Sequence, residues 1–106
     1  MKKTIDLEYA ISKIEEILSI SSQQDPYKRF TILAYQLANA GKSLRYMRIF
    51  PSEERAHTAG LKVDLSDLLI QTLTMIRLYD FDFEEILKIG ADRLADFQQR
   101  SGYKDD

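Results

Sequence analysis

The chain has 106 residues, enough for one domain and too few for two, and its 44% hydrophobic and 30% charged residues are typical of a folded globular protein. It contains no cysteine, which excludes disulfides, thiolate zinc sites and a cysteine nucleophile. Its formal net charge of −2 gives no reason to expect a nucleic-acid partner. We therefore expect a single domain over residues 1–106.

The apolar stretches are too short to cross a membrane. The longest one, residues 68–75, is interrupted by Gln71 and two threonines, whereas a bilayer-spanning helix needs roughly 20 apolar residues. The lysines near the start are followed at once by Asp6 and Glu8, which a normal signal peptide would not contain. We expect a soluble, cytoplasmic protein without a membrane partner.

The first predicted helix covers residues 5–20. Its apolar residues recur at spacings of three and four, as on one face of a helix. These residues are Ile5, Leu7, Ala10, Ile11, Ile14, Ile17 and Leu18. The mostly polar residues 19–24 predict a loop.

The second predicted helix covers residues 26–48. Asp25 is a suitable N-cap, and Pro26 would occupy the first helical position. The apolar face repeats nearly every seven residues and consists of Phe30, Leu33, Leu37, Ala40, Leu44 and Met47.

The third predicted helix covers residues 53–79, with Ser52 as its expected N-cap. Its main apolar face consists of Leu61, Leu65, Leu68, Leu69, Thr72 and Ile76, and further apolar groups lie on other sides. A helix that is apolar around much of its circumference is usually buried or shared with another subunit. We therefore expect a two-fold dimer in which the second and third helices contribute to the interface.

The fourth predicted helix covers residues 83–100. Asp82 and Glu85 have the spacing of a capping box. The side chains expected to point inward are Ile86, Ile89, Leu94 and Phe97. Residues 101–106 look like a polar tail, and nothing along the chain resembles a strand. The sequence therefore predicts an all-α domain of about four helices.

Three polar residues interrupt the apolar third helix. Asp64, Asp67 and Gln71 are spaced so that they share one narrow stripe. Carboxylates on such a helix are costly to bury unless they are paired, hydrogen-bonded or bound to a cation. Two interpretations remain open: the two acids supply oxygen ligands to Mg²⁺, or the stripe faces solvent or is neutralised by lysine or arginine.

The sequence over residues 27–97 resembles the MazG-like all-α nucleoside-triphosphate pyrophosphohydrolases. The segment Asp64-Leu65-Ser66-Asp67-Leu68-Leu69 is similar to the family's E-x-x-D motif, with Asp64 in place of glutamate. Residues 35–42 have the shape of the family's E-E-x-x-E-L-x-K motif, but Tyr35, Gln36 and Asn39 replace its three acids.

The resemblance implies a MazG-like helical bundle completed by dimerisation, as a homodimer or a dimer of dimers. It also implies Mg²⁺-dependent hydrolysis of a nucleoside triphosphate to a monophosphate and pyrophosphate. In this chain Asp64 and Asp67 would bind Mg²⁺, with Gln36 and Asn39 as auxiliary oxygen ligands. Lys42 and Arg45 would contact the phosphates of the nucleotide. No individual catalytic residue follows from the resemblance.

Some residues permit more than one interpretation. Lys42, Arg45 and Arg48 near the end of the second helix complement its dipole, or they contact phosphate. The single histidine, His57, is a general base or phosphate contact, or a partly exposed surface residue. Because the first acidic motif is missing, the alternative function is a catalytically inactive family member that serves as a dimeric interaction or regulatory module.

Overall fold

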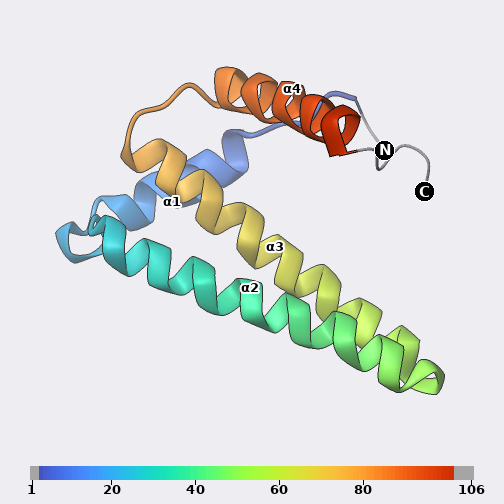
Figure 1. Cartoon of the computed structure of the whole chain (residues 1–106). Helices are drawn as coiled ribbons and strands as arrows, with labels where there is room; N and C mark the ends of the chain where they lie inside the picture. Colours follow the sequence, from blue (N-terminus) through green and yellow to red (C-terminus); the bar gives the residue numbers. More distant parts are fainter. Residues whose placement is uncertain (1–2, 102–106) are drawn as a thin grey trace.

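The computed structural model describes residues 3–101, and for Ser101 only the backbone (Figure 1). The structure confirms the all-α prediction, because the described part contains four α-helices and no strand. The helices are α1 (Glu8–Leu18), α2 (Pro26–Ile49), α3 (Glu54–Leu78) and α4 (Phe83–Ser101). Two short 3-10 turns, η1 (Ser21–Gln23) and η2 (Pro51–Glu53), precede α2 and α3. Of the predicted tail over residues 101–106, Ser101 belongs to α4 and residues 102–106 lie outside the described residues.

Two of the predicted helix starts are confirmed by their caps. Before α2, the Asp25 carboxylate accepts a hydrogen bond of 3.0 Å from the backbone N–H of Tyr27, and Pro26 follows as the first helical residue. Before α4, the Asp82 carboxylate accepts one of 2.9 Å from the backbone N–H of Glu85. Each acid satisfies a backbone donor that the helix itself leaves without a partner.

The other two starts differ from the prediction. Helix α1 begins at Glu8 rather than at residue 5, and the Asp6 carboxylate accepts the N–H of Glu8 at 2.9 Å. The prediction of Ser52 as N-cap of α3 is wrong. The backbone N–H of Glu53 bonds to the carbonyl of Phe50 at 2.9 Å, so Ser52 is taken up in the 3-10 turn and Glu53 becomes the residue before the helix.

Helices α2 and α3 form a long hairpin, running side by side in opposite directions from the turn at η2 (Figure 1). Helix α1 packs against the end of α3 that is remote from this turn. Few residues of the described part are buried: apolar Ile14 and Ala40, and polar Arg29 and Thr74. The core of a single chain is therefore thin and partly polar.

The C-terminal end of α3 is closed by a Schellman motif. The backbone N–H of Phe81 bonds to the carbonyl of Ile76 and that of Asp80 to the carbonyl of Arg77, both at 3.0 Å. Asp80 adopts a φ of 57°, the left-handed conformation this motif requires. The chain therefore stops α3 abruptly and turns towards α4 within a few residues.

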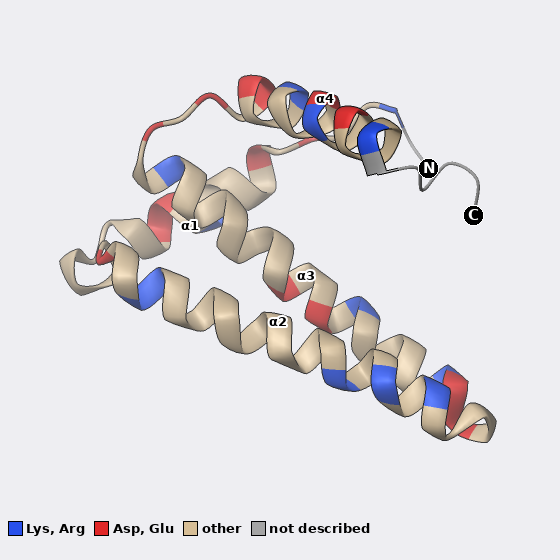
Figure 2. Cartoon of the chain, in the orientation of Figure 1, with Lys and Arg blue, Asp and Glu red and all other residues tan. Residues whose placement is uncertain are grey.

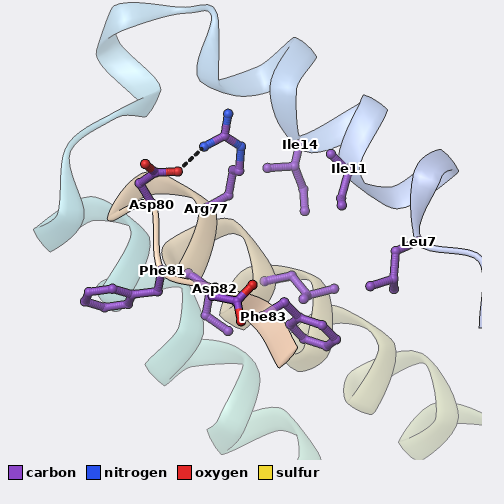
Figure 3. A pocket seen from close by; sticks show the side chains of 10 residues that line it. Leu7, Ile11, Ile14, Arg77, Asp80, Phe81, Asp82 and Phe83 are labelled. Carbon is purple, nitrogen blue, oxygen red and sulfur yellow. Dashed lines mark hydrogen bonds and ion pairs between the residues drawn. The ribbon is translucent and has the colours of Figure 1, made fainter. Parts of the chain in front are cut away.

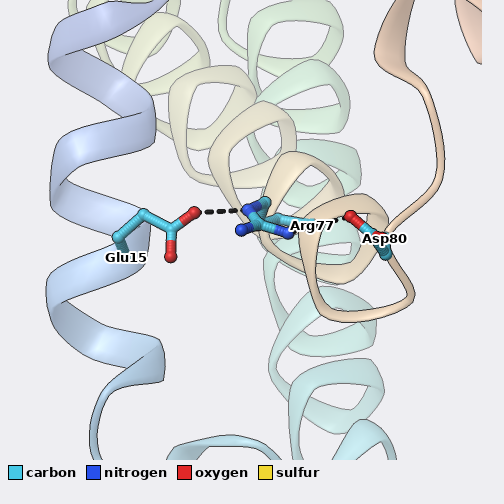
Figure 4. A network of polar contacts seen from close by, with 3 residues as sticks. All are labelled: Glu15, Arg77 and Asp80. Carbon is cyan, nitrogen blue, oxygen red and sulfur yellow. Dashed lines mark hydrogen bonds and ion pairs between the residues drawn. The ribbon is translucent and has the colours of Figure 1, made fainter.

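Arg77 joins this corner to α1 (Figure 4). Its guanidinium donates to the Glu15 carboxylate of α1 and to the Asp80 carboxylate, the latter at 3.1 Å. The hydrogen bond to Glu15 and the charge of Glu15 raise the pKa of Arg77. Desolvation opposes this rise, and the charge of Asp80, the smallest of the four effects, adds to it. All three side chains are well exposed, so we assign this network a positioning role rather than a large stabilising one.

Beside this network lies a hollow of about 420 Å³ between α1, the end of α3 and the start of α4 (Figure 3). Its walls are mostly apolar and include Leu7, Ile11, Ile14 and Phe83. Helix α4 leaves this corner and does not return to the hairpin (Figure 1). Residues 87–100 are all exposed, so the prediction that Ile89, Leu94 and Phe97 point inward is wrong for a single chain; only Ile86 is half-buried.

The chain exposes far more surface than its mass requires. Its accessible surface is 8889 Å², about 2,800 Å² more than the roughly 6,100 Å² expected for a compact monomer of 12.3 kDa. Its radius of gyration is 16.5 Å, against about 13 Å for a compact domain of this length. The excess includes large apolar side chains along the hairpin.

Candidate functional site

Six polar residues lie where α2 and α3 face each other, and we call them the polar seam: Gln36, Asn39 and Ser43 of α2, and Asp64, Asp67 and Gln71 of α3. All six are half-buried. Among the described residues, three side-chain hydrogen bonds join the two helices: one from the Thr58 hydroxyl to the Met47 sulfur at 3.2 Å, and two that involve the seam. The Ser43 hydroxyl donates to the Asp64 carboxylate at 2.8 Å, and Arg29 donates to the side-chain oxygen of Gln71 at 3.4 Å.

The register brings the predicted motif residues together. Gln36 and Asn39 lie on α2 between Arg29 and Ser43, and Gln36 is seven residues from each, so it shares their face. Asp67 lies between Asp64 and Gln71 on the facing side of α3. The predicted ligands Gln36, Asn39, Asp64 and Asp67 therefore occupy the middle of the seam on opposing helices.

The stripe of Asp64, Asp67 and Gln71 does not face open solvent, since it is half-buried towards α2. The ion pairs among the described residues involve other acids, so neither aspartate is neutralised by lysine or arginine there. Ion pairing, hydrogen bonding and a bound cation are three ways to stabilise such acids. The structure provides a hydrogen bond, from the Ser43 hydroxyl to one oxygen of Asp64. A cation remains a chemically suitable partner for the rest.

The helices approach closely beside Asp64. A Cβ atom added to Gly60 would lie 3.6 Å from the Ser43 hydroxyl oxygen, which is an ordinary contact. Gly60 therefore lies beside α2 one turn before Asp64, at a separation that would also admit a methyl group. The close approach leaves the Asp64 carboxylate within reach of α2 side chains.

The donor set of the seam suits a hard divalent cation. It offers two carboxylates and the carbonyl oxygens of two amides, and Mg²⁺ takes oxygen ligands, usually one or two carboxylates with waters and substrate phosphates. Within residues 3–101, no group of three or more histidine, cysteine, aspartate and glutamate side chains is arranged to hold a metal. The seam therefore fits one weakly held ion better than a multi-metal centre.

Lys42 and Arg45 lie outside the seam. Both are exposed and line a shallow hollow with Ala38 and Gly41. The Lys42 ammonium lies 5.6 Å and the Arg45 guanidinium carbon 6.0 Å from the centre of the Tyr46 ring. Because Ser43 points to α3, these two side chains project to other sides of α2. Figure 2 shows the basic residues along this part of α2 and the acidic pair on α3.

His57 is part of the hairpin tip rather than of the seam's centre. Its ring lies 5.4 Å from that of Tyr46, and its Nε2 is 3.6 Å from the Glu53 carboxylate. It precedes Asp64 by seven residues, which is about 10 Å along a helix. The structure therefore favours a packing role at the tip over a role as base beside Asp64.

Two residues of the site were missed in the sequence: Ser43, which orients Asp64, and Arg29, which is buried against Gln71. The signal that could have found them is the seven-residue spacing of Arg29, Gln36 and Ser43. That spacing places polar groups on one face of α2, beside the apolar row of Phe30, Leu37 and Leu44.

Comparisons of the chain with protein-family models, with curated proteins and with solved structures found no match. None of the helices in residues 3–101 is both long enough and apolar enough to span a membrane.

Proposed function

We propose that this protein is a MazG-like, Mg²⁺-dependent nucleotide-binding protein of the cytoplasm, and a weak or divergent nucleoside-triphosphate pyrophosphohydrolase. The observation that carries the proposal is the pair of half-buried aspartates, Asp64 and Asp67, facing the amides of α2 without a lysine or arginine partner among residues 3–101. Half-buried acids in this position are more stable with a cation than without one.

The residues of the seam have distinct roles in this proposal. Asp64 and Asp67 hold Mg²⁺, whose charge would offset that of the triphosphate. The Ser43 hydroxyl orients Asp64 by its 2.8 Å hydrogen bond. Gln36 and Asn39 add neutral oxygen ligands, which contribute position but no negative charge. The affinity for the ion is accordingly low without nucleotide.

We further propose that the working unit is a homodimer, or a dimer of dimers. If each of two copies buried its excess surface of about 2,800 Å², the interface would total about 5,600 Å², at the upper end of what obligate subunit interfaces bury. An exposed apolar row on α2, Phe30, Leu37 and Leu44, continues onto exposed Leu65 and Leu69 of α3. Lys42 and Arg45 project away from the seam of their own chain, so in the dimer they would meet the phosphates of a nucleotide bound between subunits.

The metal site is tested by thermal melts with and without Mg²⁺ or Mn²⁺. A cation that binds only the folded protein raises the melting temperature with its concentration. The Asp67→Asn variant should lose this rise, and should be at least as stable as the parent without metal, since a like-charge repulsion is removed. The matched control is Asp96→Asn in α4, an exposed acid paired with Arg100, which should retain the rise.

Two outcomes would contradict the metal site. One is an equal rise in the parent and in Asp67→Asn. The other is a loss of stability in Asp67→Asn with and without metal, which would mean that Asp67 is held by a protein partner.

The alternative function is an inactive dimeric interaction or regulatory module. Tyr35, Gln36 and Asn39 favour it, because they stand where the resembling family has acids. Pyrophosphate release from each common nucleoside triphosphate separates the two functions. We expect slow turnover that disappears in Asp67→Asn; nucleotide binding without any release of pyrophosphate would support the module instead.

A further inference from the structure

Arg29 is a buried charge with neutral neighbours. Its side chain is only 6% exposed. Its guanidinium donates to the side-chain oxygens of Gln71 at 3.4 Å and Gln23 at 2.5 Å, both uncharged amides. Its Nε is buried without an acceptor, and no carboxylate of residues 3–101 forms an ion pair with it. A buried guanidinium normally has an anion beside it, because isolated burial of a charge is strongly unfavourable.

Arg29 lines a small cavity where three helices meet. The cavity has a volume of about 210 Å³, and its other polar lining residues are Lys13, Gln71 and Thr74. Its apolar walls are Ile14 and Ile17 of α1 and Ile70 of α3. None of these lining residues is acidic. The cavity thus combines one buried cation, one cation at the rim and an apolar wall.

Lys13 has only weak surface partners. Its side chain is 58% exposed, its ammonium is 3.8 Å from the carboxylate of Glu16, whose side chain is 71% exposed, and it lies 5.6 Å from the centre of the Tyr9 ring. The Thr74 hydroxyl donates to the carbonyl of Ile70 at 2.7 Å, which fixes it in the wall. Of the polar lining groups, Arg29 and Lys13 therefore have unused capacity to donate to an anion.

We propose that this cavity binds a small organic anion, namely a carboxylate or phosphoryl group attached to a short apolar body. The Arg29 guanidinium and the Lys13 ammonium take the anionic oxygens, and the three isoleucines take the apolar body. The site needs no metal. It shares Gln71 with the polar seam but includes neither Asp64 nor Asp67, the pair that carries the proposed function. Its occupant would supply the counter-charge that Arg29 lacks.

The test uses thermal melts in EDTA, so that metal binding cannot contribute. The probes are phenyl phosphate and benzoate, with benzyl alcohol as a neutral analogue and inorganic phosphate as an anion without an apolar body. At least one organic anion should raise the melting temperature by several degrees in a saturable manner. Benzyl alcohol should not, and inorganic phosphate should act more weakly. The stronger of the two organic anions identifies the head group.

The variant Arg29→Met should lose the response to the organic anions. Without anion it should melt at or above the temperature of the parent, because an apolar chain replaces an unneutralised buried charge. The matched control is Lys28→Met, which removes an exposed charge from the adjacent position of α2 and should respond like the parent.

A second variant keeps the test decisive if Arg29→Met fails to fold. Ile17→Phe enlarges a half-exposed wall residue and narrows the cavity while leaving Arg29 in place. It should weaken the response by tenfold or more in half-saturating concentration. The proposal is overturned if neither organic anion raises the melting temperature of the parent in a saturable manner. It is also overturned if the rise persists unchanged in both variants. If Arg29→Met does not fold, an unchanged rise in Ile17→Phe alone overturns it.

Discussion

The inner and outer sides of the α2–α3 hairpin differ in how well they are covered. The side on which the helices meet combines the polar seam with buried Ala40 and half-buried Leu33 and Met47. The side turned away from this contact carries Phe30, Leu37 and Leu44, which are 56%, 63% and 54% exposed. The hydrophobic effect stabilises folded chains by removing such groups from water, which is why we propose that a second copy covers the outer side.

The largest expected effect comes from placing a charge on the outer side. Leu37→Asp should reduce the free energy of unfolding by about 2–4 kcal/mol and produce monomers, because a leucine buried between subunits would be replaced by an unpaired carboxylate. Urea unfolding at several protein concentrations and sedimentation would measure both effects. In an uncovered monomer the same change at an exposed position should stay within about 0.5 kcal/mol.

The control for this variant is Thr31→Asp, which adds the same charge at an exposed polar position of α2. It should leave the assembly intact. Equal, small effects of both substitutions would show that the outer side of α2 faces solvent in the native protein.

An intermediate effect is expected on the inner side. Ser43→Ala removes the hydroxyl that donates to the half-buried Asp64 carboxylate at 2.8 Å. The free energy of unfolding should fall by about 1–2 kcal/mol, as for other hydrogen bonds to charged groups. Chemical denaturation compares it with Ser66→Ala, an exposed serine of α3 that bonds only to the carbonyl of Lys62 in its own helix. If the two variants lose the same stability, the contact with Asp64 contributes little.

The smallest expected effects come from two glycines, one on each side. Gly60→Ala should raise the free energy of unfolding by about 0.5–1 kcal/mol, because alanine favours the helix and its methyl group would meet Ser43 at an ordinary 3.6 Å. Gly41 lies on the outer side, and in a single chain a Cβ there would touch nothing within 4 Å.

We expect no such gain from Gly41→Ala, since a second copy packed on the outer side would meet the added methyl group. Thermal melts and the dimer dissociation constant check both substitutions. Equal stabilisation by both alanines would indicate that the two sides of the hairpin do not differ in coverage.

The sequence predicted the features that depend on neighbouring residues. Asp25 and Asp82 were identified as caps because a capping acid bonds only two or three residues ahead. Ser52 failed for a local reason as well, because the 3-10 turn that begins at Pro51 moved the helix start by one residue. The start of such a helix depends on the conformation of the turn before it. One favourable capping residue does not determine that conformation.

The side on which α2 packs could not be predicted from periodicity. Of the predicted apolar face of α2, Leu33, Ala40 and Met47 are buried or half-buried, whereas Phe30, Leu37 and Leu44 are exposed. The face that meets α3 also includes the polar row of Arg29, Gln36 and Ser43. Periodicity identifies an apolar face but not which partner covers it. The expectation that Gln36 and Asn39 face the aspartates came from the family resemblance. The separation of Lys42 and Arg45 from the seam required the register of the two helices.

The three-residue turn η2 between α2 and α3 has a consequence for the order of folding. Its short closure makes the contacts of the hairpin local in sequence, and proteins dominated by local contacts fold in microseconds to milliseconds. The hairpin of each chain should therefore form in a first phase whose rate is independent of concentration. Covering of the outer side would follow as a slower, bimolecular phase, so a newly made chain would pass through a stage in which its apolar surface is open to partners other than its own copy.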